Sequence, residues 1–544
     1  MFTIKIKNQN FQFEEKITLE KLAKQLGVIA YVAKVNNRLR ELAYYVNYNA
    51  EIEFLDLTSF DASKVYETSI RYLMIMALEK LYPDIKVNFS QGVSRSLICD
   101  VSNIQTNIDV AFLNNLEKEM KKIVEANYPI IRKKIKKEEA MAIYQQRGYL
   151  DKIEVLKYRP EDTVNVYVCE NYLNYMFGYM VPSTGYLKHF QLKLYYPDFI
   201  VQLPRPEKNG NIPEFVDSPS FGKMLQEAKE WSHLCQADSI SKLNRFVEEG
   251  KVVDLVNMCE TKHNNMLSEL GLRIKNDINN IRLIAIAGPS SSGKTTFSHR
   301  LRIELMTRGI RPVKISIDDY YLDRDQAPID EFGQPDFEHI GALDIDLFNR
   351  NLLALIQGEE VDTPIFNFEQ GKRIGWHREK LERNTPIIIE GIHALNDQLT
   401  SLIPKNQKFK IYISPTSQIN IDNHNPISPT EIRMLRRIVR DAKYRNTHPS
   451  TTFSMWASVR RGEFKWIYPF QEQADFIFNT ELTYELGVMK KYALPALEKI
   501  DHDDEYFIPA NRLIKFLKYF KDIDDRFVPC NSLLREFIGE SCFY

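Results

Sequence analysis

The chain has 544 residues, which at about 150 residues per domain predicts roughly three or four domains. With 44% hydrophobic and 27% charged residues, 21 Gly and 24 Pro, it is typical of a folded protein, and collagen-like and disordered classes are excluded. Its formal net charge of -1 provides no global attraction to nucleic acid or to an anionic membrane. The six cysteines form no CxxC pair, which disfavours a disulfide framework or a zinc ribbon. Because the first residues alternate in polarity and no apolar run reaches about 18 residues, we expect a cytoplasmic protein without an export signal or a membrane span.

The first half of the chain predicts mixed α and β structure. Short runs of alternating polarity predict strands at Phe2–Ile6, Phe11–Phe13, Tyr31–Val35 and Ile52–Leu55, with one helix over Leu19–Leu26 after the N-cap Thr18. The period becomes helical from about Ser69, and further helices are expected at Leu113–Ala126 and Glu138–Gln146. A Pro/Gly/Asn-rich loop over Leu203–Pro213 precedes a nearly all-helical stretch, Ser220–Asp277, which we interpret as a connector.

From Arg282 the pattern becomes α/β. Apolar strands are predicted at Leu283–Ala287, Val313–Ile317, Ile387–Ile389 and Phe409–Ile413, and helices between them at Thr296–Thr307 and Asp344–Gln357. Buried strands that alternate with helices predict a parallel sheet covered on both faces. The tail after about Tyr484 is again helical in pattern.

The most informative motif follows the first of these strands and opens a helix. It is Gly288-Pro289-Ser290-Ser291-Ser292-Gly293-Lys294-Thr295, followed by Thr296, and it fits G-x-x-x-x-G-K-[ST]. Its glycines let backbone N–H groups and the helix N-terminus face phosphate oxygens. Lys294 would neutralise β- and γ-phosphate charge, and the Thr295 hydroxyl would bind Mg²⁺. The alternative is a chance Gly/Ser-rich turn before a helix.

Three carboxylates follow two later strands. Asp318 and Asp319 come after the second strand, where a carboxylate could accept the proton of an attacking hydroxyl; the alternative is an acidic helix N-cap. Glu390 ends the strand Pro386–Ile389 and suits Mg²⁺, or is a solvated strand end. A D-x-x-G occurs at Asp330–Gly333, but no [NT]-K-x-D guanine-reading motif follows, which disfavours a GTPase.

Four arginines are spaced to share one face of a later helix. These are Arg433, Arg436, Arg437 and Arg440. Such a face could close over a triphosphate and stabilise transition-state charge, or it could simply be solvated.

In order over about 200 residues, these segments resemble the uridine kinase/phosphoribulokinase group of P-loop kinases. The matching blocks are 288–296, S-I-D-D-Y-Y (316–321), D-F-E-H (336–339), P-I-F-N-F (364–368), I-E-G-I-H-A-L (389–395) and L-R-R-I-V-R-D (435–441). The resemblance implies ATP and Mg²⁺ as cofactors, Asp318 as the general base, and Thr295 with Glu390 at the metal. It also implies Lys294, Arg436, Arg440 and Arg445 on the phosphates, and Tyr321, Glu338, Phe366 and Arg373 around the acceptor.

One departure leaves the acceptor open. In uridine kinases a histidine that reads the pyrimidine edge follows the aromatic block, whereas this sequence has Gly371 there. The acceptor is therefore a nucleoside-like compound, or alternatively a sugar phosphate or another hydroxyl compound.

The first half resembles the N-terminal region of threonyl-tRNA synthetase. Residues 1–60 are similar to its β-grasp TGS module, and Leu81-Tyr82-Pro83, the region 119–140 and Val181-Pro182-Ser183-Thr184-Gly185 are similar to its editing domain. The positions of the editing His and Cys residues hold Tyr72, Met76, Met176 and Met180, so the resemblance implies a domain without editing chemistry. The basic run Arg132–Lys137 could contact RNA or tRNA weakly, but we favour a solvated helix flank balanced by Glu138 and Glu139.

Together these observations predict a multidomain fold. We expect an N-terminal β-grasp module (1–60), an α+β editing-like domain (61–205), a helical connector (206–278), an α/β P-loop kinase domain with a parallel sheet (279–483) and a helical C-terminal extension (484–544). The favoured function is Mg²⁺-ATP-dependent phosphorylation of a small-molecule hydroxyl. Two alternatives are an RNA- or ribosome-associated regulator that uses nucleotide binding as a switch, and a kinase regulated by a metabolite in the editing-like pocket.

Overall fold

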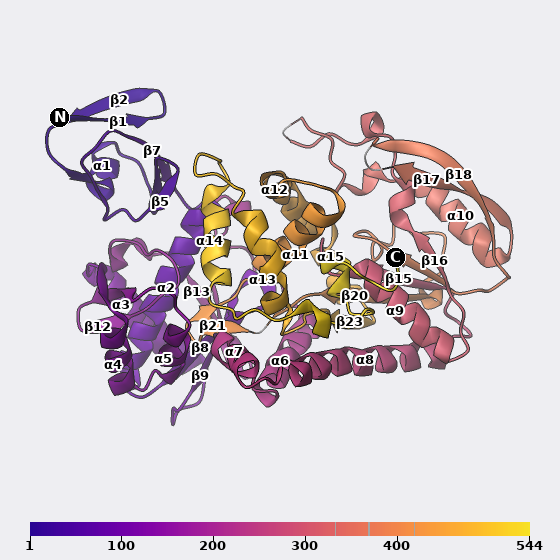
Figure 1. The fold of residues 1–544 in the computed structure, drawn as a ribbon, viewed down its shortest axis with the longest axis horizontal. Helices are drawn as coiled ribbons and strands as arrows, with labels where there is room; N and C mark the ends of the chain where they lie inside the picture. Colours follow the sequence, from indigo (N-terminus) through magenta and orange to yellow (C-terminus); the bar gives the residue numbers. More distant parts are fainter. Residues whose placement is uncertain (332, 368–369, 418) are drawn as a thin grey trace.

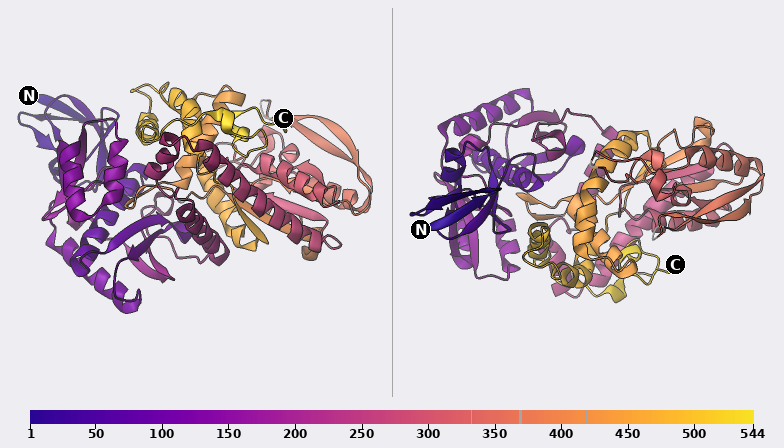
Figure 2. Two further views of the ribbon diagram at one scale, coloured as in Figure 1. Left: turned by 60° about the horizontal axis from the view of Figure 1, so that its bottom comes forward. Right: turned by 90° about the horizontal axis from the view of Figure 1, so that it is seen from above.

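The computed structural model describes residues 1–331, 333–367, 370–417 and 419–544. Phe368, part of the aromatic block of the kinase resemblance, lies outside these residues. The molecule is elongated, with the N-terminal β-rich module at one end, the sheet that carries the P-loop motif toward the other, and the C-terminal helices between them (Figures 1 and 2). Within the described residues, no helix is long and apolar enough to cross a membrane.

The N-terminal module is a five-stranded sheet with one helix. Its strand order is β2-β1-β7-β4-β5, with β1 parallel to β7 and the other pairs antiparallel. The elements are β1 (Phe2–Ile6), β2 (Gln9–Phe13), α1 (Leu19–Gln25), β4 (Val32–Val35), β5 (Arg38–Arg40) and β7 (Ala50–Leu55). Helix α1 begins after Thr18, whose hydroxyl accepts a hydrogen bond from the Lys21 amide at 3.2 Å, which confirms the predicted cap. The β-grasp assignment itself stays a prediction.

The next region packs two sheets around a long buried helix. That helix, α2 (Phe60–Leu81), begins nine residues before the predicted helical period because Ala62, Val65 and Tyr66 already face the core. One sheet has the order β13-β14-β9-β8 and the other β10-β11-β12. These elements are β8 (Lys86–Gln91), β9 (Leu97–Ser102), α3 (Val110–Ala126), β10 (Ile131–Lys136), α4 (Lys137–Arg147), α5 (Leu150–Lys157), β11 (Thr163–Cys169), β12 (Tyr172–Asn174), β13 (Gln191–Tyr195) and β14 (Asp198–Gln202).

The basic run is solvated and directly precedes helix α4, as expected of a helix flank, but it forms a strand, which we did not predict. Residues Ile131–Lys136 form β10, which pairs antiparallel with β11 and leaves most of its side chains exposed. The pairing with the apolar side chains of Val164 and Val166 on β11 outweighs the local charge pattern, so tertiary context decides the structure here.

Three helices connect the two halves of the chain. These are α6 (Pro219–Leu234), α7 (Ile240–Glu248) and α8 (Val252–Asn276), the last running along the edge of the molecule toward the second half (Figure 1). Their apolar faces share one core with a face of the following sheet and with the C-terminal helices. The helical connector is therefore packed on the second half and is not a free linker.

The second half is built on a five-stranded parallel sheet. The order is β16-β19-β15-β20-β23, and all four neighbouring pairs are parallel. The strands are β15 (Leu283–Ala287), β16 (Val313–Ser316), β19 (Ile387–Glu390), β20 (Lys408–Ser414) and β23 (Phe476–Asn479), the last of which was not predicted. Helices α9 (Lys294–Thr307) and α10 (Ile345–Gln357) follow the predicted ranges, and a hairpin of β17 (Glu360–Asn367) and β18 (Lys372–Lys380) extends beyond the sheet (Figure 1). The remaining helices are α11 (Pro429–Tyr444), α12 (Pro449–Trp466), α13 (Glu485–Leu497), α14 (Phe507–Leu517) and α15 (Arg535–Ile538).

A small hairpin ties the two halves together. Its strand β21 (Asn420–Asp422) contacts α5 and α7, and its strand β22 (Asn425–Pro426) contacts β8 of the two-sheet region around α2. Lys152 of α5 forms an ion pair with Asp422 at 3.0 Å, and both side chains are fully buried. Removal of either partner alone would leave the other charge buried without compensation.

Candidate active site

The phosphate-binding loop lies between β15 and α9. Ser291 and Gly293 both take positive φ angles, +61° and +91°, and so curl the loop around the helix N-terminus. A side chain on Gly288 would collide with the carbonyl oxygen of Ile413 on β20, so only glycine fits there. The loop thus has the strand, turn and helix context that a phosphate cradle needs.

Lys294 is folded back onto this loop. Its Nζ donates to the carbonyl oxygens of Gly288 and Pro289, at 3.0 and 3.2 Å. Burial lowers the pKa of Lys294, and the nearby carboxylates Glu390 and Asp318 oppose that shift. The ammonium group therefore lies between the loop carbonyls and the carboxylates of Glu390 and Asp318.

Thr295 and Glu390 meet where the strands of the sheet end. The Thr295 hydroxyl donates to the Glu390 carboxylate at 3.1 Å, and Lys314 forms an ion pair with the same carboxylate at 3.4 Å. Among the described residues, no group of three or more His, Cys, Asp or Glu side chains forms a metal centre. One hydroxyl and one carboxylate nevertheless fit Mg²⁺, which binds phosphates and water together with one or two protein oxygens.

Asp318 lies at the same edge of the sheet, directly after β16. The residue is exposed, while desolvation by the surrounding protein, and next the Glu390 charge, raise its pKa to about 7. A carboxylate with a pKa near the working pH is suited to accept a proton and release it again. Asp318, Lys294 and Glu390 thus converge on one place.

The arginine helix α11 is not the open basic face that its spacing suggested. Arg436 is fully buried, and it donates to Glu485 at 2.7 Å, to the Thr480 carbonyl at 2.8 Å and to the Ser291 carbonyl of the loop at 3.4 Å. Arg433 is held by a bidentate pair with Glu463. The expected direct phosphate role of Arg436 does not fit this burial, and its place is to hold α11 behind the loop.

Three further arginines lie beside the same loop. Arg437 donates to the Ser290 hydroxyl at 3.0 Å, and Asp441 pairs with Arg437, Arg440 and Arg445 at 3.3, 2.9 and 3.6 Å. Three guanidinium groups share one buried carboxylate, so positive charge is left over beside the loop. The sequence predicts that the four arginines share one helix. It does not predict their partners, because Glu463 and Glu485 belong to other helices.

Aromatic and acidic side chains expected at the acceptor site lie together. The rings of Tyr321 and Phe366 are 5.7 Å apart, and the Tyr321 hydroxyl donates to the Phe337 carbonyl at 3.1 Å. Glu338 packs on Gly462 of α12, where a Cβ would come within 2.6 Å of the Glu338 Cβ. Burial, and next the Glu463 charge, raise the pKa of Glu338 to about 7.

Arg373 has a different surrounding from the one expected. Its guanidinium donates to the carbonyl oxygens of Tyr320 and Tyr321 and to Asp344, at 3.3, 3.1 and 3.1 Å. These bonds fix the segment that carries Asp318 and Tyr321. These bonds indicate that Arg373 holds this segment in place. They do not indicate a direct contact of Arg373 with an acceptor.

The C-terminal segment also reaches the phosphate loop, which no sequence signal indicated. The Glu536 carboxylate accepts from the Thr296 backbone N–H at 2.9 Å, and the hydroxyl groups of Tyr544 and Thr296 are 2.7 Å apart. His299 stacks on Phe543 with ring centroids 5.3 Å apart. A carboxylate thus occupies one of the free amides at the start of α9, where anions are favoured.

In the first half, the positions of the synthetase-type editing residues are filled by an apolar core. Tyr72, Met76, Met176 and Met180 are at most 8% exposed and belong to one cluster. The Tyr72 hydroxyl donates to the carbonyl oxygens of Tyr167 and Tyr172. These four side chains present no ligand for a metal and no general base.

A parallel sheet with a phosphate loop, a carboxylate at each of two neighbouring strand ends and an arginine helix defines a P-loop kinase domain. Residues 283–485 match the model of the phosphoribulokinase/uridine kinase family, and the C-terminal half of the chain carries a domain of this family.

The first half is similar to threonine–tRNA ligases. That of Syntrophomonas wolfei is 29% identical over 194 residues, 35% of this chain and 30% of the ligase. Threonine–tRNA ligase 1 of Bacillus subtilis is 30% identical over 206 residues, 37% of this chain and 32% of the ligase. The chain thus spans about a third of the length of these relatives.

Two of the solved structures similar to this chain are kinases by title. One is a putative fructose transport system kinase from Silicibacter sp. TM1040, 20% identical, covering 39% of this chain and 98% of that one, with a TM-score of 0.29. Another is a possible uridine kinase from Bacillus stearothermophilus, 15% identical, covering 38% of this chain and all of that one, with a TM-score of 0.25.

Proposed function

We propose that this protein transfers the γ-phosphoryl group of ATP, with Mg²⁺, to a hydroxyl of a nucleoside or a similar small molecule. The observation that carries the proposal is the meeting of Lys294, Glu390 and Asp318 at one sheet edge beside the phosphate loop. The resemblance to uridine kinases, in the printed name of the family and of one solved structure, supports a nucleoside as the first acceptor to test.

The proposed mechanism assigns one role to each group. The loop amides and Lys294 hold the β- and γ-phosphates, and Arg437 and Arg440 neutralise charge that develops during transfer. Thr295 and Glu390 would hold Mg²⁺, which supplies charge neutralisation on the phosphates. Asp318 takes the proton of the attacking hydroxyl.

The acceptor would lie on the other side of Asp318. We assign Tyr321 and Phe366 to its ring face and Glu338 to its hydroxyl groups, with Arg445 near the incoming phosphate. Gly371, with φ of +63°, packs on Arg324 and offers no side chain to read a base edge, so a pyrimidine is not singled out.

The test is ADP release by the purified full chain with Mg²⁺-ATP and a panel of nucleosides, sugar phosphates and small alcohols. Lys294→Ala should lower transfer by at least about a hundredfold, because positioning and charge neutralisation make most of the rate. Lys314→Gln is the matched control, since it removes a lysine that contacts Glu390 but lies outside the loop. Silence across the whole panel would contradict the proposal.

A second candidate function is contact with RNA through the first half. It is favoured by the exposed cationic strand β10, which carries Arg132, Lys133, Lys134 and Lys136, and by the names of the synthetase relatives. We retain the β-grasp, editing-like, connector, kinase and tail division (1–60, 61–205, 206–278, 279–483, 484–544) as part of the proposal. A salt-dependent shift of tRNA in a gel, lost when Lys133 and Lys134 are changed to Gln, would support it.

A further inference from the structure

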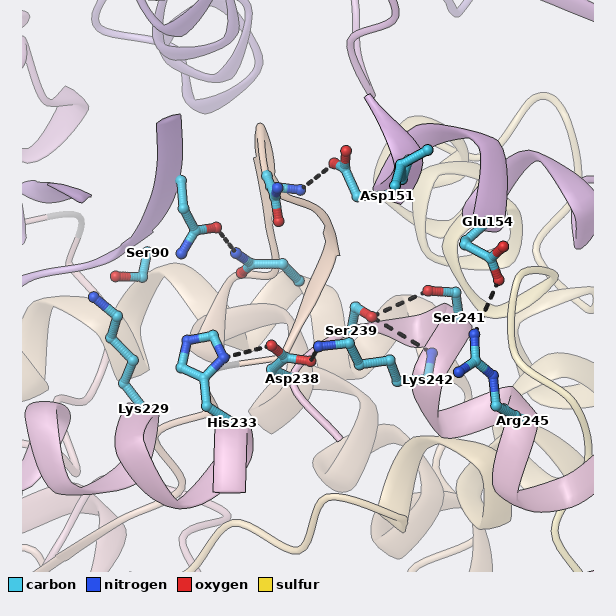
Figure 3. Close-up of a pocket in the computed structure, with 14 residues that line it drawn as sticks. Ser90, Asp151, Glu154, Lys229, His233, Asp238, Ser239, Ser241, Lys242 and Arg245 are labelled. Atoms are coloured by element: carbon cyan, nitrogen blue, oxygen red, sulfur yellow. Dashed lines mark hydrogen bonds and ion pairs between the residues drawn. The ribbon is translucent and has the colours of Figure 1, made fainter. Parts of the chain in front are cut away.

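Two cavities lie where the halves of the chain meet, and they differ in charge. The smaller, about 280 Å³, lies between β8, α5, α6, α7 and β21 (Figure 3). There Asp238 pairs with both His233 and Lys242 at 2.6 Å, and Arg245 pairs with Glu154 at 3.2 Å. Its charged groups are neutralised by one another, so it offers no excess charge to a ligand.

The larger cavity, about 540 Å³, lies between the N-terminal module, the α2 region and helices α11 and α14. Nine cationic side chains line it against four carboxylates, in a chain whose net charge is -1. The cations are Arg38, Arg40, Lys64, Arg71, Arg132, Arg159, Arg512, Lys515 and Lys518. This volume is in the range of sites for small molecules.

Several of these cations repel one another. Burial lowers the pKa of Lys515, and the charges of Arg132, Arg40 and Arg159 lower it further, with only Glu161 opposing them. Lys515 makes no ion pair among the described residues. Arg71 is 5% exposed, and its Nε finds no hydrogen-bond partner in the described part of the chain. An anion placed here would relieve like-charge repulsion and satisfy buried donors.

The cavity wall also offers flat apolar surface. Phe177 and Tyr179 line it beside the cations, and the Arg132 guanidinium lies 5.1 Å from the Tyr179 ring. Aromatic faces and stacked guanidinium groups bind flat rings. Cationic and aromatic groups together are the chemistry that recognises a phosphorylated molecule with a heterocyclic ring.

We propose that this junction cavity binds a small phosphorylated molecule with a flat ring, the chemistry of a nucleotide, and that its occupancy is sensed by α11. Lys515 on α14 completes the cation cluster, so the site depends on the C-terminal helix as well as on the first half.

The link to the phosphate loop is α11 itself. Glu431, in its first turn, lines the cavity and pairs with Arg512 at 2.9 Å and Lys64 at 3.8 Å. Nine residues later on the same helix is Arg440, about 14 Å along the axis at 1.5 Å per residue. A phosphate that competes for Arg512 and Lys64 would therefore change the contacts at one end of the helix whose other end carries the loop arginines.

The binding test uses the full chain carrying Lys294→Ala, so that the phosphate loop is weakened and turnover is not needed. ATP, UTP and inorganic tripolyphosphate are titrated by calorimetry. We expect one nucleotide per chain, at least tenfold weaker when Lys515→Gln or Arg132→Gln is added, and unchanged within about twofold with Lys499→Gln, an exposed lysine outside the cavity. Nucleotide binding that ignores Lys515 and Arg132, or no binding, would overturn the proposal.

Two further comparisons test whether the ligand carries a flat ring and whether it is a small molecule and not RNA. Tripolyphosphate that binds as tightly as ATP and UTP would refute the assignment of the flat ring. A tRNA shift that depends on Arg132, without nucleotide binding, would replace the proposal by an RNA surface. Hydrogen exchange should slow in residues 429–444 on nucleotide addition in the Lys294→Ala chain but not when Lys515→Gln is added; equal exchange in both would refute the link through α11.

Discussion

The pKa of Asp318 gives the sharpest test of the proposed chemistry. Surrounding protein and the Glu390 charge raise it from 3.8 to about 7, so at pH 7 about half of the molecules carry a protonated Asp318. A general base works only when it is deprotonated. The rate should therefore rise with pH through this range and not fall.

The size of the effect follows from the pKa. With a value of about 7, about a tenth of Asp318 is ionised at pH 6 and about nine-tenths at pH 8. For the acceptor found in the panel, kcat/KM should be about fivefold lower at pH 6 than at pH 7, and about twofold higher at pH 8. At the ordinary value of 3.8 the change over this range would be under about 1%.

The assay is ADP release between pH 5.5 and 8.5, at saturating Mg²⁺-ATP, for wild type and Asp318→Asn. The variant should lose roughly 10²- to 10⁴-fold in kcat and lose the pH dependence below 7 as well. Asp319→Asn is the matched control, because it removes the neighbouring carboxylate from the same turn; it should stay within about threefold and keep the pH profile. A flat wild-type profile, or an Asp318→Asn chain with near wild-type rate, would refute the reasoning.

Two further predictions concern contacts outside the proposed chemistry. Lys152→Met leaves Asp422 charged and buried, so urea unfolding should show a loss of about 3–5 kcal/mol. Adding Asp422→Asn removes the charge and keeps an acceptor oxygen for the His424 amide and Asn425, so it should recover part of the loss; equal losses in both chains would contradict this. Glu536→Gln removes the carboxylate at the Thr296 amide, which is worth about 0.3–1 kcal/mol at a helix N-terminus, and nucleotide should bind about two- to fivefold more tightly by calorimetry. Weaker binding would instead make Glu536 a supporting residue of the site.

The features that could be predicted from the sequence are those set by local physics. The spacing of glycine and lysine between Leu283–Ala287 and α9 locates the phosphate loop in the sequence. Apolar runs predict four of the buried strands. The strand β23, Phe476–Asn479, was not predicted, although it is as long as β16 and β19, which were. Strand β10 was missed because five of its six side chains are exposed and four are cationic, so only the pairing with β11 defines it as a strand.

The parts of the site that escaped prediction depend on partners far along the chain. The spacing of the arginines on α11 puts them on one helix, but the burial of Arg436 is decided by Glu485, 49 residues later. Arg373 is bound by Asp344 and two backbone carbonyls, none of which the local pattern announces. Distances along the sequence carry no information on such pairs.

The contact between Glu536 and the Thr296 amide also has a consequence in time. The two residues are 240 positions apart, and at about 5–20 residues per second the ribosome needs on the order of 10 to 50 s to pass from one to the other. During that interval α9 can form while its first-turn amide still lacks the carboxylate. A nascent chain would therefore meet cellular nucleotides with an uncovered phosphate loop, before the C-terminal segment arrives to share it.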